Sequence, residues 1–515
     1  MWTGSDDGLL HLTRDGGKSW TNVTPKGAPQ WIMWNAIDPS PFDRGTAYVA
    51  GTMYKSDDFR PYLYRTTDYG ATWTKITSGI AADHFTRVVR TDKRRKGLLF
   101  AGTERGMYVS FDDGGSWQSL QLNLPIVPIT DLAVRDDDLI AATQGRSFWI
   151  LDDITPLQQL DAAATAKSAH LFTPRTTWRT GGYAGERTPR NQGTNLPSGV
   201  LVSYWIPPAA KTGTKVKLAF LAADGSMIRE LEGEVKPPPP PVEAKEQKDP
   251  PSEPEKKIDV KSEGGEQEAK AAESEDKDPK AEKEKEKNKL PDSAPGFNRY
   301  AWDLRYPEAT KFEGLVLWGG GTDGPRVVPG SYTARLTVGE ESMTVPVQLK
   351  QDPRTSASQA DLEAQFQFLL AANRKLAEIH TQIERIREVR AQLKDIRKRA
   401  GSAESGKALT EAAKALDTQM TAIEEALYQT RNRSSQDPLN FPIRLNDKLA
   451  SVAESAAAGD FAPTAQHRAV YAELVTQIDA QLAKLRELFD TELPKLNEQA
   501  KSVDLFGGAP AKPPM

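Results

Sequence analysis

Hydrophobic residues in the first 156 positions occur in short runs that turn residues separate, which is the pattern of β-strands. Runs of this kind are 45–51, 62–65, 97–102 and 106–110. A further group at 129–134, 138–143 and 147–152 keeps the same order of apolar runs. The pattern therefore predicts a repeated unit of a few short strands.

Three eight-residue stretches in this region share one template: a hydroxyl residue, any residue, Asp, any residue, Gly, any residue, Ser or Thr, and Trp. They occupy residues 13–20, 66–73 and 110–117, and their aspartates are 53 and 44 residues apart. That spacing is typical of four-stranded propeller blades. Each stretch lies between β-rich runs, so we expect a hairpin turn in which Asp accepts backbone hydrogen bonds and Gly adopts positive φ.

The three stretches resemble the Asp-box (BNR) repeat, which implies a structural role for the residues of the template. These residues are Asp15, Gly17, Trp20, Asp68, Gly70, Trp73, Asp112, Gly114 and Trp117. We interpret residues 1–156 as an incomplete Asp-box β-propeller of three blades plus part of another, because closed propellers have about 4–8 blades. We also expect the chain to be truncated at its N-terminus, since residues 1–8 already look like blade sequence.

Residues 157–235 and 296–352 contain further strand patterns, including 199–206, 215–221, 298–305 and 330–338. They predict an immunoglobulin-like β-sandwich. Residues 236–295 interrupt it with a Pro-, Lys- and Glu-rich segment that lacks aromatic residues. Because such a segment cannot bury enough apolar surface to offset its ordering entropy, we predict a disordered insert.

Apolar residues in 356–503 follow three- and four-residue spacing, as in Leu376, Ile379, Ile383 and Ile386. This spacing predicts three long helices and one short one, arranged as an antiparallel bundle or coiled-coil hairpin. We expect residues 504–515 to form a loose tail. The predicted fold class is thus multidomain, mainly β and then α.

Composition excludes several kinds of site in this chain of 515 residues. A net charge of −4 gives no indication of nucleic-acid binding, and no apolar run approaches the length of a membrane span. The absence of cysteine excludes disulfides and thiolate metal sites, and the five histidines are widely spaced. We predict no metal site and no cofactor.

Candidate ligand contacts are charged residues at strand starts or in loops that could face a central funnel. They are Arg87, Glu104, Asp131 and Arg146. A solvated loop position is the alternative for each. No catalytic residue is assigned, because no paired acids, nucleophile elbow or phosphate loop can be identified.

Residues 100–117 and 142–156 resemble the C-terminal half of bacterial sortilin/VPS10-like BNR-repeat "glycosyl hydrolase" proteins. This resemblance implies an extracytoplasmic, periplasmic or secreted, protein. We expect a binding or scaffold module for a protein or carbohydrate ligand, with self-association through the helical region or an open propeller edge. The alternative is a glycoside hydrolase with part of its active site in missing blades, although the Phe/Tyr-Arg-Ile-Pro segment of sialidases does not occur.

Overall fold

The structure is a computed structural model that describes residues 1–160, 168–180, 193, 195–237, 289–290, 293–400 and 404–503. It divides into two compact units. The first unit comprises residues 1–175, 193–196 and 203–209, and the second comprises 176–192, 197–202 and 210–515. The finer division into a propeller, a sandwich, an insert, a helical bundle and a tail stays a prediction.

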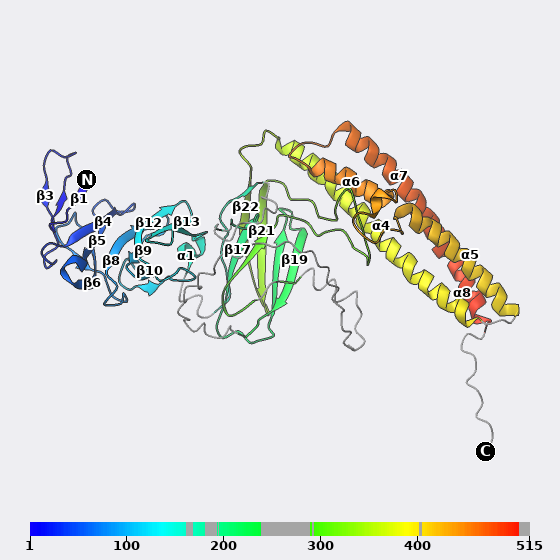
Figure 1. The fold of residues 1–515 in the computed structure, drawn as a ribbon, viewed down its shortest axis with the longest axis horizontal. Helices are drawn as coiled ribbons and strands as arrows, with labels where there is room; N and C mark the ends of the chain where they lie inside the picture. The colour runs from blue at the N-terminus through cyan, green and yellow to red at the C-terminus, as the bar shows by residue number, and fades with distance from the viewer. Residues whose placement is uncertain are drawn as a thin grey trace, which may run out of the picture. The chain divides into compact units, whose positions relative to one another are not determined.

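The first unit contains four consecutive small antiparallel sheets (Figure 1). Their strands, in chain order, are β1 (Trp2–Gly4), β2 (Leu10–Leu12) and β3 (Thr21–Asn22); β4 (Met33–Pro39), β5 (Ala47–Met53), β6 (Asp58–Thr66) and β7 (Thr74–Lys75); β8 (Thr86–Thr91), β9 (Leu99–Thr103), β10 (Gly106–Ser110) and β11 (Gln118–Ser119); and β12 (Ile129–Arg135), β13 (Asp138–Thr143) and β14 (Phe148–Leu151). The single-turn helix η1 (Tyr54–Ser56) links β5 to β6, and α1 (Thr155–Gln159) follows β14.

Neighbouring sheets of this unit meet through their first strands, since β4 packs against β1 and β8, and β8 packs against β12. Apolar side chains fill each interface, for example Leu10 with Trp34, Leu63 with Val89, and Phe100 with Leu132. All are buried, and burial of such a side chain stabilises a fold by about 1.5–3 kcal/mol. The short apolar runs of the sequence therefore supply the side chains that pack one sheet against the next.

The β-part of the second unit is dominated by a five-stranded sheet of order β16-β22-β21-β18-β19. Its strands are β16 (Thr177–Arg179), β18 (Lys215–Leu221), β19 (Met227–Glu234), β21 (Gly330–Val338) and β22 (Glu341–Gln351). Strand β17 (Val200–Ile206) lies next to β20 (Gly296–Trp302) in a smaller sheet. The second half of β17 belongs to the first unit, where β15 (His170–Leu171) pairs with it.

Trp302 connects the two kinds of sheet in the second unit. Its ring is fully buried, stacks on Phe220 of β18 at 4.4 Å between centroids, and meets Tyr332 of β21 edge-on at 5.9 Å. Aromatic pairs in these geometries stabilise a core beyond their area alone. The hydrophobic side of β20 therefore faces the five-stranded sheet.

The predicted insert 236–295 lies almost entirely outside the described residues, as does the predicted tail 504–515. Four described residues of the insert, Lys236, Lys289, Leu290 and Ser293, border the sheet. Leu290 donates its N–H to the Glu232 carbonyl, and Lys236 donates its N–H to the Ser293 carbonyl, both at 2.8 Å. Leu290 and Ser293 are buried, so the chain returns to the edge of β19 before residue 296.

The C-terminal part of the second unit is helical, which confirms the predicted order of β followed by α (Figure 1). Its elements are α4 (Gln359–Arg399), α5 (Glu404–Leu427), η2 (Asp437–Leu439), α6 (Leu445–Ala457), α7 (Ala465–Glu487), the π-turn η3 (Leu488–Glu492) and α8 (Leu493–Lys501). Helix α4 packs against α5, α6 and α7 around one continuous apolar core. Capping boxes at Ser358 and Thr464 begin α4 and α7.

The glycine run 319–321 packs against helix α6. A Cβ atom on Gly320 would lie 2.4 Å from the Ala450 carbonyl oxygen. The buried Asp447 carboxylate accepts the backbone N–H groups of Trp318 and Gly319 at 2.9 and 3.0 Å. Only a residue without a side chain permits this close approach at position 320.

We predict that Gly320→Ala lowers the free energy of unfolding of the second unit by about 1–3 kcal/mol, because the added methyl group meets fixed backbone. Urea unfolding followed by the helical circular dichroism signal measures the change. Gly321→Ala is the matched control, since the nearest atom to its Cβ would be the Asp323 nitrogen at 3.9 Å. A Gly320→Ala protein as stable as the control would contradict the close approach.

His380 is a neutral histidine in the helical core. Its Nδ1–H donates to the Thr310 carbonyl at 2.6 Å, and the Asn446 amide donates to Nε2 at 3.2 Å. Burial lowers the pKa of His380 to about 4, against an ordinary value near 6.5. Protonation therefore favours the unfolded chain, and stability falls as the pH drops from about 6.5 towards 4.

Between pH 7 and pH 5 we expect His380 to account for a loss of about 2 kcal/mol, at about 1.4 kcal/mol per pH unit below its unfolded pKa. Urea unfolding at both pH values should show this loss in the natural chain. The same comparison in His380→Gln should show a pH dependence that is smaller by that amount. An identical dependence in both proteins would assign the effect to other groups.

Candidate functional site

The three template turns of the first unit have the same hydrogen bonds. They connect β2 to β3, β6 to β7, and β10 to β11. Asp68 accepts the backbone N–H of Thr72 at 2.9 Å through one oxygen and its hydroxyl at 2.6 Å through the other. Asp15 and Asp112 accept the same pair from Ser19 and Ser116 at 2.6–3.0 Å.

The first hydroxyl of each template completes the turn. Thr66 donates to Asp68 and accepts the Gly70 N–H, both at 2.8 Å. Thr13 with Gly17 and Ser110 with Gly114 repeat this arrangement. Both oxygens of each aspartate are therefore engaged inside its own turn.

These hydrogen bonds favour the ionised carboxylates. Bonds from Ser19 and Thr13 hold the pKa of Asp15 well below its usual range, and bonds from Thr72 and Thr66 lower the pKa of Asp68. Partial burial acts to raise the pKa of Asp112, but bonds from Ser116 and Ser110 outweigh it and the pKa is lowered. Permanently charged carboxylates of this kind are unsuited to donate a proton.

The glycine and tryptophan of two templates contact the preceding sheet. The indole N–H groups of Trp73 and Trp117 donate to the carbonyls of Val23 and Ile76, both at 2.7 Å. Gly70 and Gly114 have positive φ, and a Cβ on either would lie within 2.7 Å of Val23 or Ile76. In the first template, Trp20 is 45% exposed, and no described residue accepts its indole N–H.

Sheet topology separates the template turns from the predicted ligand contacts. In the two four-stranded sheets the template turn follows the third strand, β6 or β10, and in the first sheet it follows the second described strand, β2. In an antiparallel sheet, the first strand starts, the second ends and the third starts at the same end of the sheet. This end lies opposite the template turn, and we call it the far end. Arg87 near the start of β8, Glu104 after β9, and Arg146 between β13 and β14 all lie at the far end.

Arg87 and Glu104 form an ion pair inside an aromatic group. Arg87 Nε lies 2.7 Å from Glu104 Oε2, and the guanidinium lies 5.6 and 5.2 Å from the ring centres of Tyr54 and Phe85. Tyr54 stacks on Phe85 at 5.1 Å, and Phe59 lies 6.1 Å from Phe85. We call these five residues the Arg87 cluster.

Asp131 does not join this cluster. Its carboxylate binds Arg90 at 2.6 Å, and the same arginine donates to the Leu132 carbonyl at 2.9 Å, so that it bridges β8 and β12. Arg146 donates to the carbonyl of its neighbour Gly145 at 3.0 Å. Of the four predicted ligand contacts, Arg87 and Glu104 therefore pair with each other. Asp131 pairs with Arg90 instead, and Arg146 lies in a loop.

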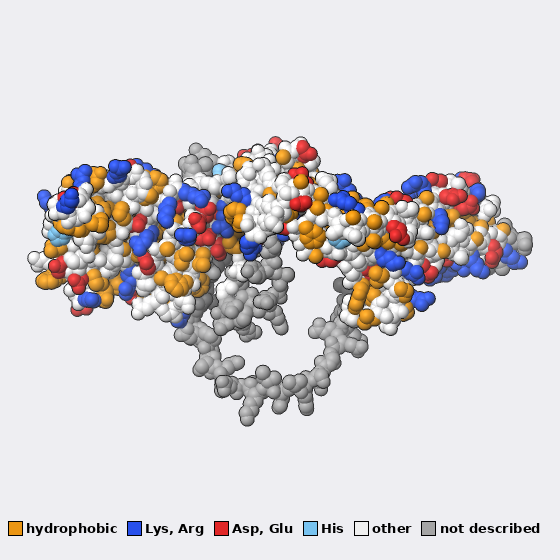
Figure 2. Space-filling model, turned by 90° about the horizontal axis from the view of Figure 1, so that it is seen from above, with side chains coloured by type: hydrophobic (Ala, Val, Ile, Leu, Met, Phe, Trp, Pro, Cys, Tyr) orange, Lys and Arg blue, Asp and Glu red, His pale blue; other side chains and the backbone are white. Residues whose placement is uncertain are grey.

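Exposed hydrophobic side chains at the far end were not predicted from the sequence. They are Trp31, Phe59, Leu122, Ile126 and Phe148. Each precedes or begins a strand at this end, according to the strand bounds. Figure 2 shows hydrophobic side chains in patches among Lys and Arg on one face of the first unit. An isolated apolar residue in a loop gives no periodic pattern, so sequence reasoning had no means of finding this surface.

No group of three His, Cys, Asp or Glu residues in the described ranges is arranged to hold a metal ion. Among the helices of the described residues, none is long and apolar enough to cross a membrane.

Similarity to known proteins is confined to part of the chain. Residues 8–141 match the Sortilin-Vps10 family (sortilin, neurotensin receptor 3). The match runs from just before β2 into β13, inside the first unit, and confirms the predicted sortilin/VPS10-like resemblance there. No curated protein matches the chain.

Several solved structures resemble a portion of the chain. YCF48 bound to D1 peptide has 22% identity and a TM-score of 0.24, over 29% of this chain and 47% of that chain. YCF48 from Cyanidioschyzon merolae has 20% identity and a TM-score of 0.23, over 30% and 49%. The GH74 xyloglucanase from Xanthomonas campestris has 15% identity and a TM-score of 0.24, over 45% and 41%. The match spans about half the length of the YCF48 structures.

We predict that Trp117→Phe lowers the stability of the first unit by about 1–2 kcal/mol, because it leaves the buried Ile76 carbonyl without its donor. Trp117 is 4% exposed, whereas the equivalent Trp20 is 45% exposed and supplies the matched control. Trp20→Phe should change stability by less than about 0.5 kcal/mol. Equal losses in chemical denaturation of the two variants would show that the indole bond is unimportant.

Proposed function

We propose that the first unit is a non-catalytic binding module that holds a segment of a partner protein at the far end. The observation that carries the proposal is the set of exposed hydrophobic side chains at this end, one of which, Phe59, packs on Phe85 beside Arg87. Exposed aromatic residues beside an arginine are typical of protein interfaces, where they supply most of the binding energy.

The state of the acidic residues favours binding over hydrolysis. A glycosidase needs two carboxylates on either side of the scissile bond, one of which carries a proton. Glu104 and Asp131 are instead paired with different arginines, and the template aspartates are held in turns at the other end of the sheets. A glycoside hydrolase remains the alternative, and a carbohydrate remains the alternative ligand.

We propose further that the four sheets are three blades and part of another, and that the β-part of the second unit is an immunoglobulin-like sandwich. The strand orders and the burial of Trp302 support these assignments. The Sortilin-Vps10 match supports an extracytoplasmic location, since sortilin-type propellers are extracellular or lumenal. A second copy of this chain, bound through the helices or a propeller edge, stays the other predicted partner.

Selection of peptides from a random phage-display library on the intact chain, followed by titration of synthetic peptides, tests the binding role. We expect Phe59→Ala to weaken the selected peptides at least tenfold. Phe42→Ala is the matched control, because Phe42 has a similar exposure of 40% against 49% and lies in the β4–β5 turn at the box end, where the template turns lie. Equal weakening by both variants, or by neither, would refute binding at the far end.

Incubation with xyloglucan, β-glucan and sialyl substrates tests the alternative. We expect no release of sugar. Turnover that Glu104→Gln or Asp131→Asn abolishes would replace the binding proposal with glycoside hydrolysis.

A further inference from the structure

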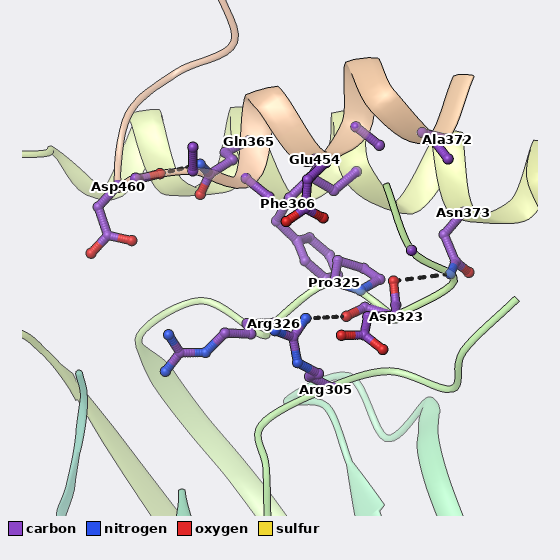
Figure 3. A pocket seen from close by; sticks show the side chains of 18 of the residues that line it. Arg305, Asp323, Pro325, Arg326, Gln365, Phe366, Ala372, Asn373, Glu454 and Asp460 are labelled. Carbon is purple, nitrogen blue, oxygen red and sulfur yellow. Dashed lines mark hydrogen bonds between the residues drawn. The ribbon is translucent and has the colours of Figure 1, made fainter. Parts of the chain in front are cut away.

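A pocket in the described part of the second unit is lined by helices α4 and α6 and by the loop residues 305 and 321–326. Its volume is 760 Å³, within the range of small-molecule sites. Figure 3 shows Arg305 and Arg326 on the loop side and Gln365 and Phe366 on the helix side. This site is separate from the far end of the first unit and does not depend on the function proposed there.

Three arginines form the polar side of the pocket. Arg179 is buried, donates to the Val327 carbonyl at 2.9 Å, and pairs with Asp460 at 2.6 Å. Arg305 donates to the Gly324 carbonyl at 2.8 Å, and Arg326 donates to the Thr180 carbonyl at 2.6 Å. One backbone bond fixes each guanidinium, and Arg179 uses a further donor for Asp460, so that these bonds use one or two of the five N–H donors of each group.

Two of these arginines, Arg305 and Arg326, form no ion pair with a carboxylate of the described residues. In the described part of this unit, no carboxylate oxygen lies within 4.0 Å of the Arg305 or Arg326 guanidinium. The pocket acids Asp460 and Asp352 are already paired with Arg179 and Arg354, each at 2.6 Å. The remaining acids that line the pocket, Asp323 and Glu454, are exposed, and Figure 3 shows Asp323 on the same side as Arg305.

The electrostatic consequence is seen at Arg326. Burial lowers its pKa to about 10, and the positive charges of Arg179 and Arg305 act in the same direction. Like charges held together in a partly buried site repel one another, and an anion between them would relieve that repulsion. Asp460 and Asp303 only partly offset the effect.

The helix side of the pocket carries a group of apolar side chains. Phe366, Leu369 and Leu376 of α4 and Leu449 and Ala453 of α6 line this side, beside the polar Gln365, Asn373 and Glu454. Phe366 is half-buried and lies 5.3 Å from the ring of Tyr306, so its orientation is fixed by packing. A bound molecule would thus contact guanidinium groups on one side and hydrocarbon on the other.

We infer that this pocket binds a small organic acid in which one carboxylate is attached to an apolar body. The carboxylate lies between Arg305 and Arg326, because the planar guanidinium fork matches the two oxygens of a carboxylate. The apolar body lies against Phe366 and Leu369. No bond is made or broken, and the site is one of recognition.

Isothermal titration calorimetry of the full chain with octanoate tests the inference. Octanamide is the control without charge, and acetate and inorganic phosphate are the controls without an apolar body. We expect octanoate to bind at least tenfold more tightly than each of the other three. Equal affinity for octanoate and octanamide, or no binding of octanoate, would overturn the proposal. Tight phosphate binding would replace it with an inorganic anion site.

Variants then locate the site. Arg305→Gln and Arg326→Gln should each weaken octanoate at least tenfold, and Phe366→Ala should weaken octanoate while leaving acetate unchanged. Arg468→Gln is the matched control, because Arg468 is exposed on α7 and outside the pocket. If a Gln variant melts at a lower temperature than the natural chain, Arg326→Lys replaces it and should bind octanoate with intermediate affinity. Loss of binding in Arg468→Gln equal to that in Arg326→Gln would refute the location.

Discussion

The hydrogen bonds that each template aspartate accepts within its own turn are the constraint on which the first unit depends. The carboxylate of Asp68 binds the backbone and hydroxyl of Thr72, four residues further along the chain, and so closes the turn before any contact with another sheet. The closed turn then presents Gly70 and Trp73 to the preceding sheet. Local turn chemistry and packing between sheets are therefore linked at the same eight residues.

This constraint also assigns different tasks to the two ends of the sheets. The box end is occupied by turns whose carboxylates are satisfied and charged. The far end carries the Arg87 cluster and exposed aromatic side chains. Loops held on a rigid scaffold are common sites of binding.

In the second unit, too, the packing of the fold fixes the groups that could bind a ligand. Its sheets and helices are held by apolar packing around Trp302 and the α4 core, while arginines fixed by backbone carbonyls occupy the pocket between them. Burying a charged group is unfavourable unless it is paired. Arg305 and Arg326, which pair with no carboxylate in the described part of the chain, are accordingly the feature of this unit that its fold alone does not explain.

The sequence by itself determined the elements whose interactions are local. The template turns join atoms at most eight residues apart, and helices α4 to α7 follow from apolar spacing and from caps at Ser358 and Thr464. Such contacts can be read from neighbouring letters because the backbone geometry relating them is fixed in advance.

Only the tertiary structure decided which distant residues meet. Glu104 pairs with Arg87 and Asp131 with Arg90, a choice between arginines that strand register makes and composition does not. The glycine run at 319–321 has the composition of a loop, yet Gly320 approaches Ala450 because helix α6 lies there. Arg179 and Arg326 line one pocket although 147 positions separate them in the sequence. They meet there because strand β16, the loop before β21 and helices α4 and α6 pack together. Contacts of this kind depend on the packing of whole elements, which no local pattern encodes.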